Sequence, residues 1–493
     1  MRLPFLRLAL AAAAIGAVAA STSGCQRKSE GVLQVVVVGS EPRLADPLDG
    51  PLAASDSVLV DSVAQGLVRF DARGQVEPGL SETWNVSDDG LSYIFRLANG
   101  TWPNGKKITA EQVARMLRRM MNASGGDPMG DSFGAVDEVV AMTDRVLDIE
   151  LKQPRPHLLQ LLAQPQMGLV YEGRGTGPFS IDKEKSRDGR LRLAREVATP
   201  DDEETTKEEL DLSSAAAPAA IAAFAAGKSD LVLGGTFADL PYAQQASLPR
   251  RALQFDPASG LFGLVPATEK GPIADEEVRQ FLSAAIDREA LLSALAVPGL
   301  VSRATVLEPG LDNVPDPVAP DWSSSPLPER KAALASTARR LFAGKPPVVR
   351  LALPDGPGGD VLFNRLAQDW AAFGIETKRV AANATADLKL VDEVAPSTSP
   401  SWFLRHFRCA AVPICDSKID EMLEGARDTP VIAQRSALFT EASRQIDARQ
   451  LFIPIAAPIR WSLVSGRVDG FAGNRFAIHT LTGLEQQLNR TGE

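Results

Sequence analysis

The chain has 493 residues, with 62 acidic and 52 basic side chains, and its formal net charge at pH 7 is −10. Because a nucleic-acid-binding surface must be basic enough to displace counterions from phosphates, this acidic balance argues against a nucleic-acid partner. A chain of this length is also too long for one hydrophobic core, so two or three domains are expected.

The first 24 residues have the pattern of an export signal. They begin with a positively charged stretch, and residues 8–20 are apolar but too short to span a bilayer as a mature helix. The small residues at 22–24 lead into Cys25 and resemble a bacterial lipobox, in which the cysteine is lipidated and becomes the first mature residue. The sequence therefore predicts a signal peptide over 1–24, a membrane anchor through lipid on Cys25 and a polar tether over 25–32. A secretory signal that is cleaved nearby is the alternative.

Strand and helix patterns begin directly after the tether, at residue 33. Residues 33–38 are almost entirely apolar and rich in valine, which predicts a largely buried strand. Apolar residues then occupy every second position from 91 to 97, as in a half-buried strand. Thr109 and Gln112 form a capping box that opens a helix. Residues 139–151 carry a turn between two apolar runs, which is typical of a hairpin.

The order of these residues is also informative. The run 66–113 resembles the start of the family 5 extracytoplasmic solute-binding proteins, the dipeptide, oligopeptide and nickel binders of ABC importers. That family reads GLvrfd…G…v.PgLAe.W..s.DGl.y.F.Lr.g..w.dG.plTAeDV, and this chain follows it nearly throughout. Residues 175–179 match the family's GTGPy turn, and residues 275–291 resemble its d.rvRqAl..AiDRe.l helix. Its NP.Yw run is missing, and the acidic segment in its place, through Leu210, is predicted to be a solvated loop.

The resemblance implies an α/β fold with two lobes, of the type II periplasmic-binding-protein kind, with an extra β-rich subdomain in lobe I. The predicted boundaries are 33–50, 166–255 and 455–493 for the lobe I core, 51–165 for the subdomain, and 256–454 for lobe II. Because the two ends of the family's fold share one lobe, residues 33–38 and 451–455 are expected to lie in the same sheet.

Two predicted strands end in loops that could line a ligand site. The alanine-rich segment 213–227 is predicted to be a helix, and a strand at 230–233 follows it. Residues 234–237 then form a loop at the carboxyl end of that strand, where open α/β sheets place ligands. Similarly, a strand at 388–391 is followed by a loop over 392–400.

In the resembled family the loop over 392–400 holds an aspartate that pairs with the amino end of a peptide. In this chain Pro396 takes its place, so we expect either a different solute or a peptide that is read through backbone contacts. The ligand-binding candidates are Trp402, Arg405, Asp392, Glu393, Trp461, Arg460, Thr236, Phe237 and Asp46. The alternatives are core packing for the tryptophans and solvent-exposed charges for the arginines.

The remaining reactive side chains do not form a catalytic set. Cys409 and Cys415 suit a small disulfide loop in an oxidising compartment, with two free buried thiols as the alternative. No histidine lies in a motif with metal-ligand spacing, so neither a metal nor a cofactor is predicted. Ser132 fits the Gly-x-Ser-x-Gly motif of serine hydrolases, but a glycine-rich loop precedes it where that chemistry needs a buried strand. We therefore do not expect the chain to be an enzyme.

The sequence thus predicts a monomeric lipoprotein on the periplasmic face of the bacterial envelope. Its ligand would be a peptide or another small polar solute, and its partners would be the permease and ATPase subunits of an ABC importer. The rival interpretation is a paralogue that has lost transport and acts as an envelope sensor or scaffold.

Overall fold

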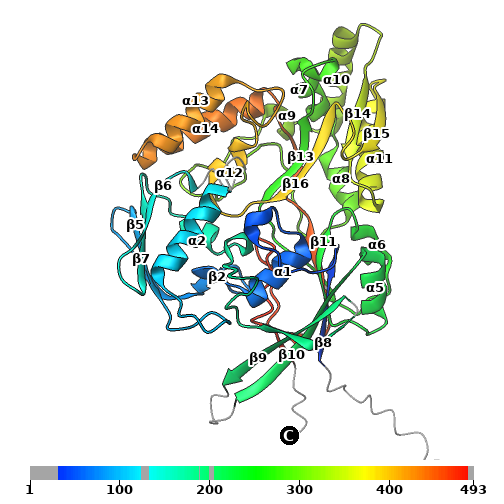
Figure 1. The fold of residues 1–493 in the computed structure, drawn as a ribbon. Helices are drawn as coiled ribbons and strands as arrows, with labels where there is room; N and C mark the ends of the chain where they lie inside the picture. The colour runs from blue at the N-terminus through cyan, green and yellow to red at the C-terminus, as the bar shows by residue number, and fades with distance from the viewer. Residues whose placement is uncertain (1–31, 124–132, 188, 199–204, 487–493) are drawn as a thin grey trace, which may run out of the picture.

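A computed structural model describes residues 32–123, 133–187, 189–198 and 205–486 (Figure 1). The predicted signal peptide, Cys25 and Ser132 lie outside these ranges. Within them, every helix falls short of the length and apolarity that a bilayer crossing needs.

Two mixed sheets form the cores of two lobes, so the predicted two-lobed α/β class is confirmed. Lobe I is built on a seven-stranded sheet in the order β12-β18-β11-β1-β10-β9-β8. Its strands and helices are β1 (Leu33–Val38), η1 (Pro47–Asp49), α1 (Ala54–Val63), β8 (Ser180–Arg187), β9 (Arg190–Ala198), β10 (Thr205–Ala215), α5 (Ala217–Ala225), β11 (Leu231–Thr236), α6 (Leu240–Gln245), β12 (Leu253–Phe255), β18 (Arg460–Val464), β19 (Val468–Asp469) and β20 (Glu485–Gln486).

Lobe II is built on a five-stranded sheet in the order β15-β14-β16-β13-β17. Its strands and helices are β13 (Gly260–Pro266), η3 (Pro272–Ala274), α7 (Glu276–Ala285), α8 (Arg288–Leu295), α9 (Asp321–Ser324), α10 (Leu327–Phe342), β14 (Val348–Leu353), α11 (Pro357–Ala371), β15 (Glu376–Ala381), β16 (Leu388–Val394), α12 (Pro400–Arg405), α13 (Ser417–Asp428), α14 (Ile432–Ala448) and β17 (Ile453–Ala456). Cys409 and Cys415, in the connection between α12 and α13, are joined by a disulfide.

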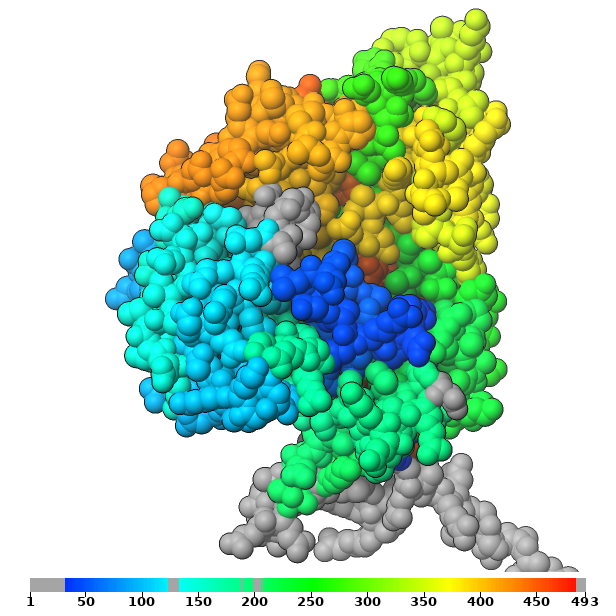
Figure 2. Space-filling model, in the orientation of Figure 1, coloured from blue at the N-terminus to red at the C-terminus, as the bar shows by residue number. Residues whose placement is uncertain are grey.

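The β-rich subdomain reaches from lobe I toward α13 and α14 of lobe II (Figures 1 and 2). Its elements are β2 (Val68–Phe70), β3 (Val76–Pro78), β4 (Ser81–Val86), β5 (Ser92–Leu97), α2 (Ala110–Ala123), β6 (Val136–Ala141), β7 (Val146–Leu151), α4 (Leu158–Leu162) and η2 (Pro165–Met167). The predicted alternation is seen in β5, where Tyr93, Phe95 and Leu97 are buried. Half of the predicted capping box forms, because the Gln112 backbone N–H donates to Thr109 Oγ1, whereas the Gln112 side chain accepts from Trp102 Nε1.

The prediction that residues 33–38 and 451–455 lie in the same sheet is wrong. Residues 453–456 form β17, which pairs with β13 in the sheet of lobe II, whereas β1 lies in the sheet of lobe I. The chain returns to lobe I one strand later, at β18, which pairs with β11. Both runs are apolar, and an apolar run shows that a strand is buried without showing which sheet it joins. The two chain crossings between the sheets are therefore 256–259 and 457–459.

A second correction concerns α1, which was predicted to lie within the subdomain. Its residues Leu59 and Val63 instead join Val35 and Val37 of β1 in one apolar cluster. The helix therefore belongs to the core of lobe I, and it covers part of the seven-stranded sheet close to the lobe boundary.

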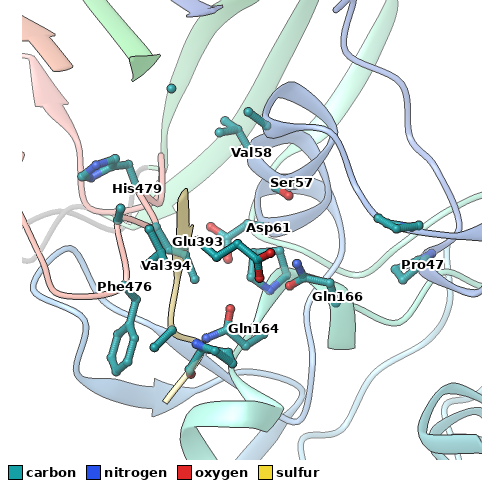
Figure 3. A pocket seen from close by; sticks show the side chains of 18 of the residues that line it. Pro47, Ser57, Val58, Asp61, Gln164, Gln166, Glu393, Val394, Phe476 and His479 are labelled. Carbon is teal, nitrogen blue, oxygen red and sulfur yellow. The ribbon is translucent and has the colours of Figure 1, made fainter. Parts of the chain in front are cut away.

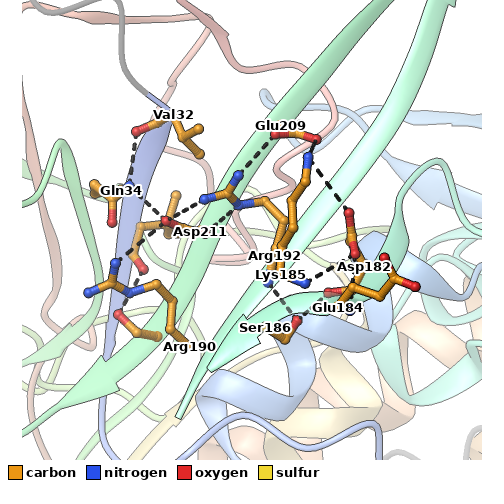
Figure 4. Close-up of polar contacts among 12 residues, drawn as sticks. Val32, Gln34, Asp182, Glu184, Lys185, Ser186, Arg190, Arg192, Glu209 and Asp211 are labelled. Atoms are coloured by element: carbon orange, nitrogen blue, oxygen red, sulfur yellow. Dashed lines mark hydrogen bonds and ion pairs between the residues drawn. The ribbon is translucent and has the colours of Figure 1, made fainter. Parts of the chain in front are cut away.

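Parts of three predicted loops, and the start of one predicted helix, are strands. Residues 205–215 are β10 rather than a solvated loop and a helix start, and β11 and β16 continue to Thr236 and Val394. The acidic residues of β10 are paired across strands (Figure 4). Arg192 Nε lies 2.6 Å from Asp211 Oδ1, and Arg192 Nη1 lies 2.9 Å from Glu209 Oε2. Such pairing lets charged residues occupy a sheet. The partners are far apart in the sequence, so the charge pattern of one segment alone does not reveal them.

The cap of α7 gives a first testable expectation. Asp275 Oδ1 accepts a hydrogen bond of 2.8 Å from the Glu277 backbone N–H at the start of this helix. Replacing Asp275 by alanine should lower the free energy of unfolding by about 1 kcal/mol, because a helix N–H then loses its partner. Chemical denaturation measures this loss. The matched variant Asp275→Asn keeps an acceptor and should stay close to the unsubstituted protein, and an equal loss in both variants would contradict the capping role.

Candidate functional site

A cavity of about 560 Å³ lies between the two lobes (Figure 3). Lobe I contributes apolar side chains from β1, α1 and β11, among them Val37, Val58 and Leu233. The subdomain contributes Gln164, and lobe II contributes residues from the end of β16 and from α12. A concave, largely apolar space with a few polar groups between two domains is the usual form of a small-molecule site.

Two carboxylates line this cavity, one from each lobe. Asp61 lies on α1, and only 8% of the residue is exposed. Burial raises the pKa of the Asp61 carboxyl to about 6, although the Thr480 hydroxyl and the Arg69 charge lower it. Its Oδ2 atom has no hydrogen-bond partner among the described residues.

The second carboxylate, Glu393, lies near the carboxyl end of β16 and is more exposed. His406 Nε2 lies 3.0 Å from Glu393 Oε2, and this hydrogen bond lowers the pKa of the glutamate despite its partial burial. The indole of Trp402 packs against His406 at a centroid distance of 4.5 Å, and Trp402 also lines the cavity. On the lobe II side of the cavity, His406 therefore positions the Glu393 carboxylate, and Trp402 packs against His406.

Hydrogen bonds beside the cavity join the subdomain to lobe II. Gln164 Nε2 donates to the Pro396 carbonyl over 2.7 Å. Gln160 Oε1 accepts from the Thr398 backbone N–H at 3.0 Å and from its hydroxyl at 3.2 Å. We call these contacts the glutamine latch. Pro396, which stands where the resembled family has its aspartate, thus presents a carbonyl to the opposite side of the cavity.

Of the nine sequence-predicted ligand residues, the structure brings only Trp402 and Glu393 to this cavity. Asp392 faces Arg460, whose Nη1 lies 2.8 Å from Asp392 Oδ1, so these two residues pair with each other across the lobe boundary. Arg405 is buried on α12, and its Nε donates to Ser401 Oγ. Asp46 caps η1 and lines a neighbouring cavity.

The other three candidates are packing residues. Trp461 is 1% exposed and donates from Nε1 to the Thr236 carbonyl over 2.7 Å. Its ring covers Gly235 so closely that a Cβ at that glycine would lie 2.2 Å from the indole. Phe237 packs edge-on against Phe262 of lobe II, with ring centroids 5.0 Å apart. β11 continues through the predicted loop as far as Thr236, which is half-buried, and the rings of Phe237 and Trp461 are buried in the core.

The residue that sequence reasoning missed is Asp61. It follows the apolar run 58–60 within α1, and an acid inside such a run is the signal that could have identified it. In the described ranges, no group of three or more histidine, cysteine, aspartate or glutamate side chains is placed to hold a metal ion. The arrangement can bind a solute through two carboxylates, amides and apolar contacts.

Known proteins share this architecture. A model of the family described as bacterial extracellular solute-binding proteins, family 5, middle region, matches residues 75–401. Probable di/tripeptide-binding protein 5 of Pseudomonas aeruginosa is 26% identical over 486 aligned residues, which cover 84% of this chain and 88% of that protein. The periplasmic oligopeptide-binding protein OppA of Salmonella typhimurium is 21% identical, with 88% and 89% covered.

Among solved structures, the Escherichia coli murein tripeptide binding protein MppA superposes with a TM-score of 0.76 at 17% identity, covering 93% of this chain and 99% of that one. Haemophilus influenzae OppA in complex with the peptide RPPGFSPFR superposes with a TM-score of 0.75 at 16% identity, covering 92% and 100%. At these identities the likeness shows the two-lobed fold.

Proposed function

Because the chain belongs to the family 5 bacterial extracellular solute-binding proteins, we propose that it is the solute-binding component of an ABC importer. It captures a peptide or another small polar solute between its lobes and delivers it to the permease. The observation that carries this proposal is the cavity of about 560 Å³ whose walls come from both lobes. The names of the relatives, a probable di/tripeptide-binding protein and an oligopeptide-binding protein, make a peptide the first candidate solute.

Capture follows from the connections between the lobes. The two crossings, 256–259 and 457–459, act as the hinge, and the solute enters when the lobes separate. A solute that contacts both walls binds the closed form better than the open form, so it shifts the population toward closure. The permease then distinguishes a closed, loaded protein from an open, empty one. Partner ATPase subunits hydrolyse the ATP.

The proposal includes an envelope location. Lipid on Cys25 would anchor the protein, as a monomer, at the periplasmic face of the membrane, with residues 25–32 as the tether. The periplasmic oligopeptide-binding relative supports this compartment.

Calorimetric titration tests the proposal most broadly. The mature chain is titrated with peptides, glycosides, opines and nickel chelates, and thermal shift is followed in parallel. We expect saturable heat with one class of solute and a higher melting temperature in its presence. If no class of solute gives heat or a thermal shift, solute capture is contradicted and a role as an envelope sensor or scaffold is favoured.

A further inference from the structure

The charge that lines the interlobe cavity has one sign. The charged or titratable side chains in its described wall are Asp61, Glu393 and His479, with neither lysine nor arginine among them. His479 is already engaged, since its Nε2 lies 3.0 Å from Asp256 Oδ2 and both side chains are buried. A solute that enters this space therefore meets two carboxylates and no free cation.

Cations close to these carboxylates have other partners. Arg69, whose charge acts on Asp61, has its Nε 2.8 Å from Glu77 Oε1, and Glu77 itself opposes ionisation of Asp61. Arg460, whose charge acts on Glu393, is paired with Asp392. Asp61 is more than nine-tenths buried, yet its Oδ2 lacks a hydrogen-bond partner in the part of the chain that the structure describes. A buried polar group without a partner is costly, and a bound cationic group would remove that cost.

Resting on the proposed function, we infer that Asp61 of lobe I and Glu393 of lobe II together hold a cationic group of the solute, an ammonium or a guanidinium. The cation contacts one carboxylate from each lobe, so its attraction to both is realised only when the lobes are closed. These two residues are therefore specificity-determining, and anionic solutes are rejected because no positive side chain in the described wall can receive them.

The site should respond to pH because one of its acids titrates near neutrality. Asp61 has a pKa of about 6, so it is protonated below that pH and then no longer attracts a cation. The groups that face it are Arg69, Glu77 and Thr480, while Glu393 faces His406 and Arg460. Affinity for a cationic solute should therefore fall as the pH is lowered through 6, while binding of a neutral solute should not.

The test uses matched probes and matched variants in calorimetry. The probes are trialanine, a lysine-containing tripeptide and spermidine. Their controls are N-acetyltrialanine, the tripeptide acetylated on both its α-amine and its lysine side chain, and triacetylspermidine, so that every cationic amine is blocked in each control. We expect the amines to bind at least tenfold more tightly than the blocked forms. Asp61→Asn and Glu393→Gln should each weaken amine binding at least tenfold, whereas the exposed control Glu421→Gln on α13 should not.

A pH series on the unsubstituted protein needs no variant that could misfold. Amine affinity should drop at least threefold between pH 7.5 and pH 5, and this drop should be smaller in Asp61→Asn. Equal binding of free and blocked amines, or saturable binding only of anionic or neutral solutes, would overturn this inference and leave the proposed function intact. Absence of binding by every solute class would overturn the proposed function, and the inference with it.

Discussion

Replacing Arg460 by methionine is expected to lower the free energy of unfolding by about 3 kcal/mol. Arg460 begins β18 in lobe I, and its guanidinium donates to both the carboxylate and the carbonyl of Asp392 in lobe II, at 2.8 and 3.1 Å. The two side chains are only 17% and 16% exposed. Removing the cation leaves a largely buried carboxylate alone, so the loss should exceed that of a surface ion pair. Urea denaturation measures it.

Two controls separate the lost pair from lost packing. The double variant Arg460→Met/Asp392→Leu removes both charges and should recover most of the loss. Arg340→Met breaks the pair between Arg340 and Glu277, whose side chains are 60% and 55% exposed, and it should cost far less stability than Arg460→Met. A similar small loss in Arg460→Met would contradict the role given to this pair.

The pH dependence of the Arg460→Met variant has a definite sign. Burial raises the pKa of Asp392, and Arg460 is the group that lowers it. Without Arg460 the pKa of the folded state rises further above the unfolded value. A carboxyl with a raised folded pKa contributes stability below its unfolded pKa, and this contribution is lost as the pH rises through the folded pKa. The deficit of Arg460→Met should therefore shrink as the pH is lowered toward 4.

The double variant Gln160→Ala/Gln164→Ala should move the empty protein, which samples open and closed forms, further toward the open form. It removes the three hydrogen bonds of the glutamine latch, which lie between 2.7 and 3.2 Å and join the subdomain to residues 396–398 of lobe II. At about 0.5–1.5 kcal/mol each, their loss amounts to roughly 2 kcal/mol, or about a thirtyfold shift toward the open form. Small-angle scattering should record a larger radius of gyration, and solute affinity should fall with the closed population.

Gln368→Ala is the matched control for the latch, because Gln368 is exposed on α11 and its Oε1 accepts only from Arg365 within the same lobe. This variant should leave both the scattering curve and the affinity unchanged. An unchanged radius of gyration in the latch variant, with an unchanged affinity, would mean that the lobes are held together by other contacts.

Much of the fold could be predicted from the sequence because its apolar periodicities are strong. β1 occupies the predicted residues 33–38, and the predicted alternation over 91–97 is seen in β5, where Tyr93, Phe95 and Leu97 are buried. Predictions failed where pairing decided the outcome. Acidic β10 is a strand because Arg192 on β9 and Lys185 on β8 pair with its Glu209, and β17 joins lobe II because its partner β13 lies there.

The candidate site could be predicted only in part, for the same reason. Trp402 and Glu393 were placed at the cleft by the order of residues around the loop that precedes α12. Asp392, one residue earlier on the same strand, points away from the cavity and pairs with Arg460, because neighbouring side chains of a strand point to opposite faces. Asp61 becomes visible as a site residue only when α1 is seen to pack on the lobe I sheet and to face lobe II.

The most direct test of the account is the distance between the lobes with and without solute. Spin labels at Arg119→Cys on α2 and Glu421→Cys on α13 place one exposed label on each side of the cleft. The labelled chain starts after Cys25, so that this cysteine is not labelled as well. Double electron–electron resonance should then give a longer, broader distribution of distances between the two labels for the empty protein. A single shorter distance should appear when a solute identified by calorimetry saturates it. The same distribution in both states, at proven saturation, would contradict capture by closure of the two lobes.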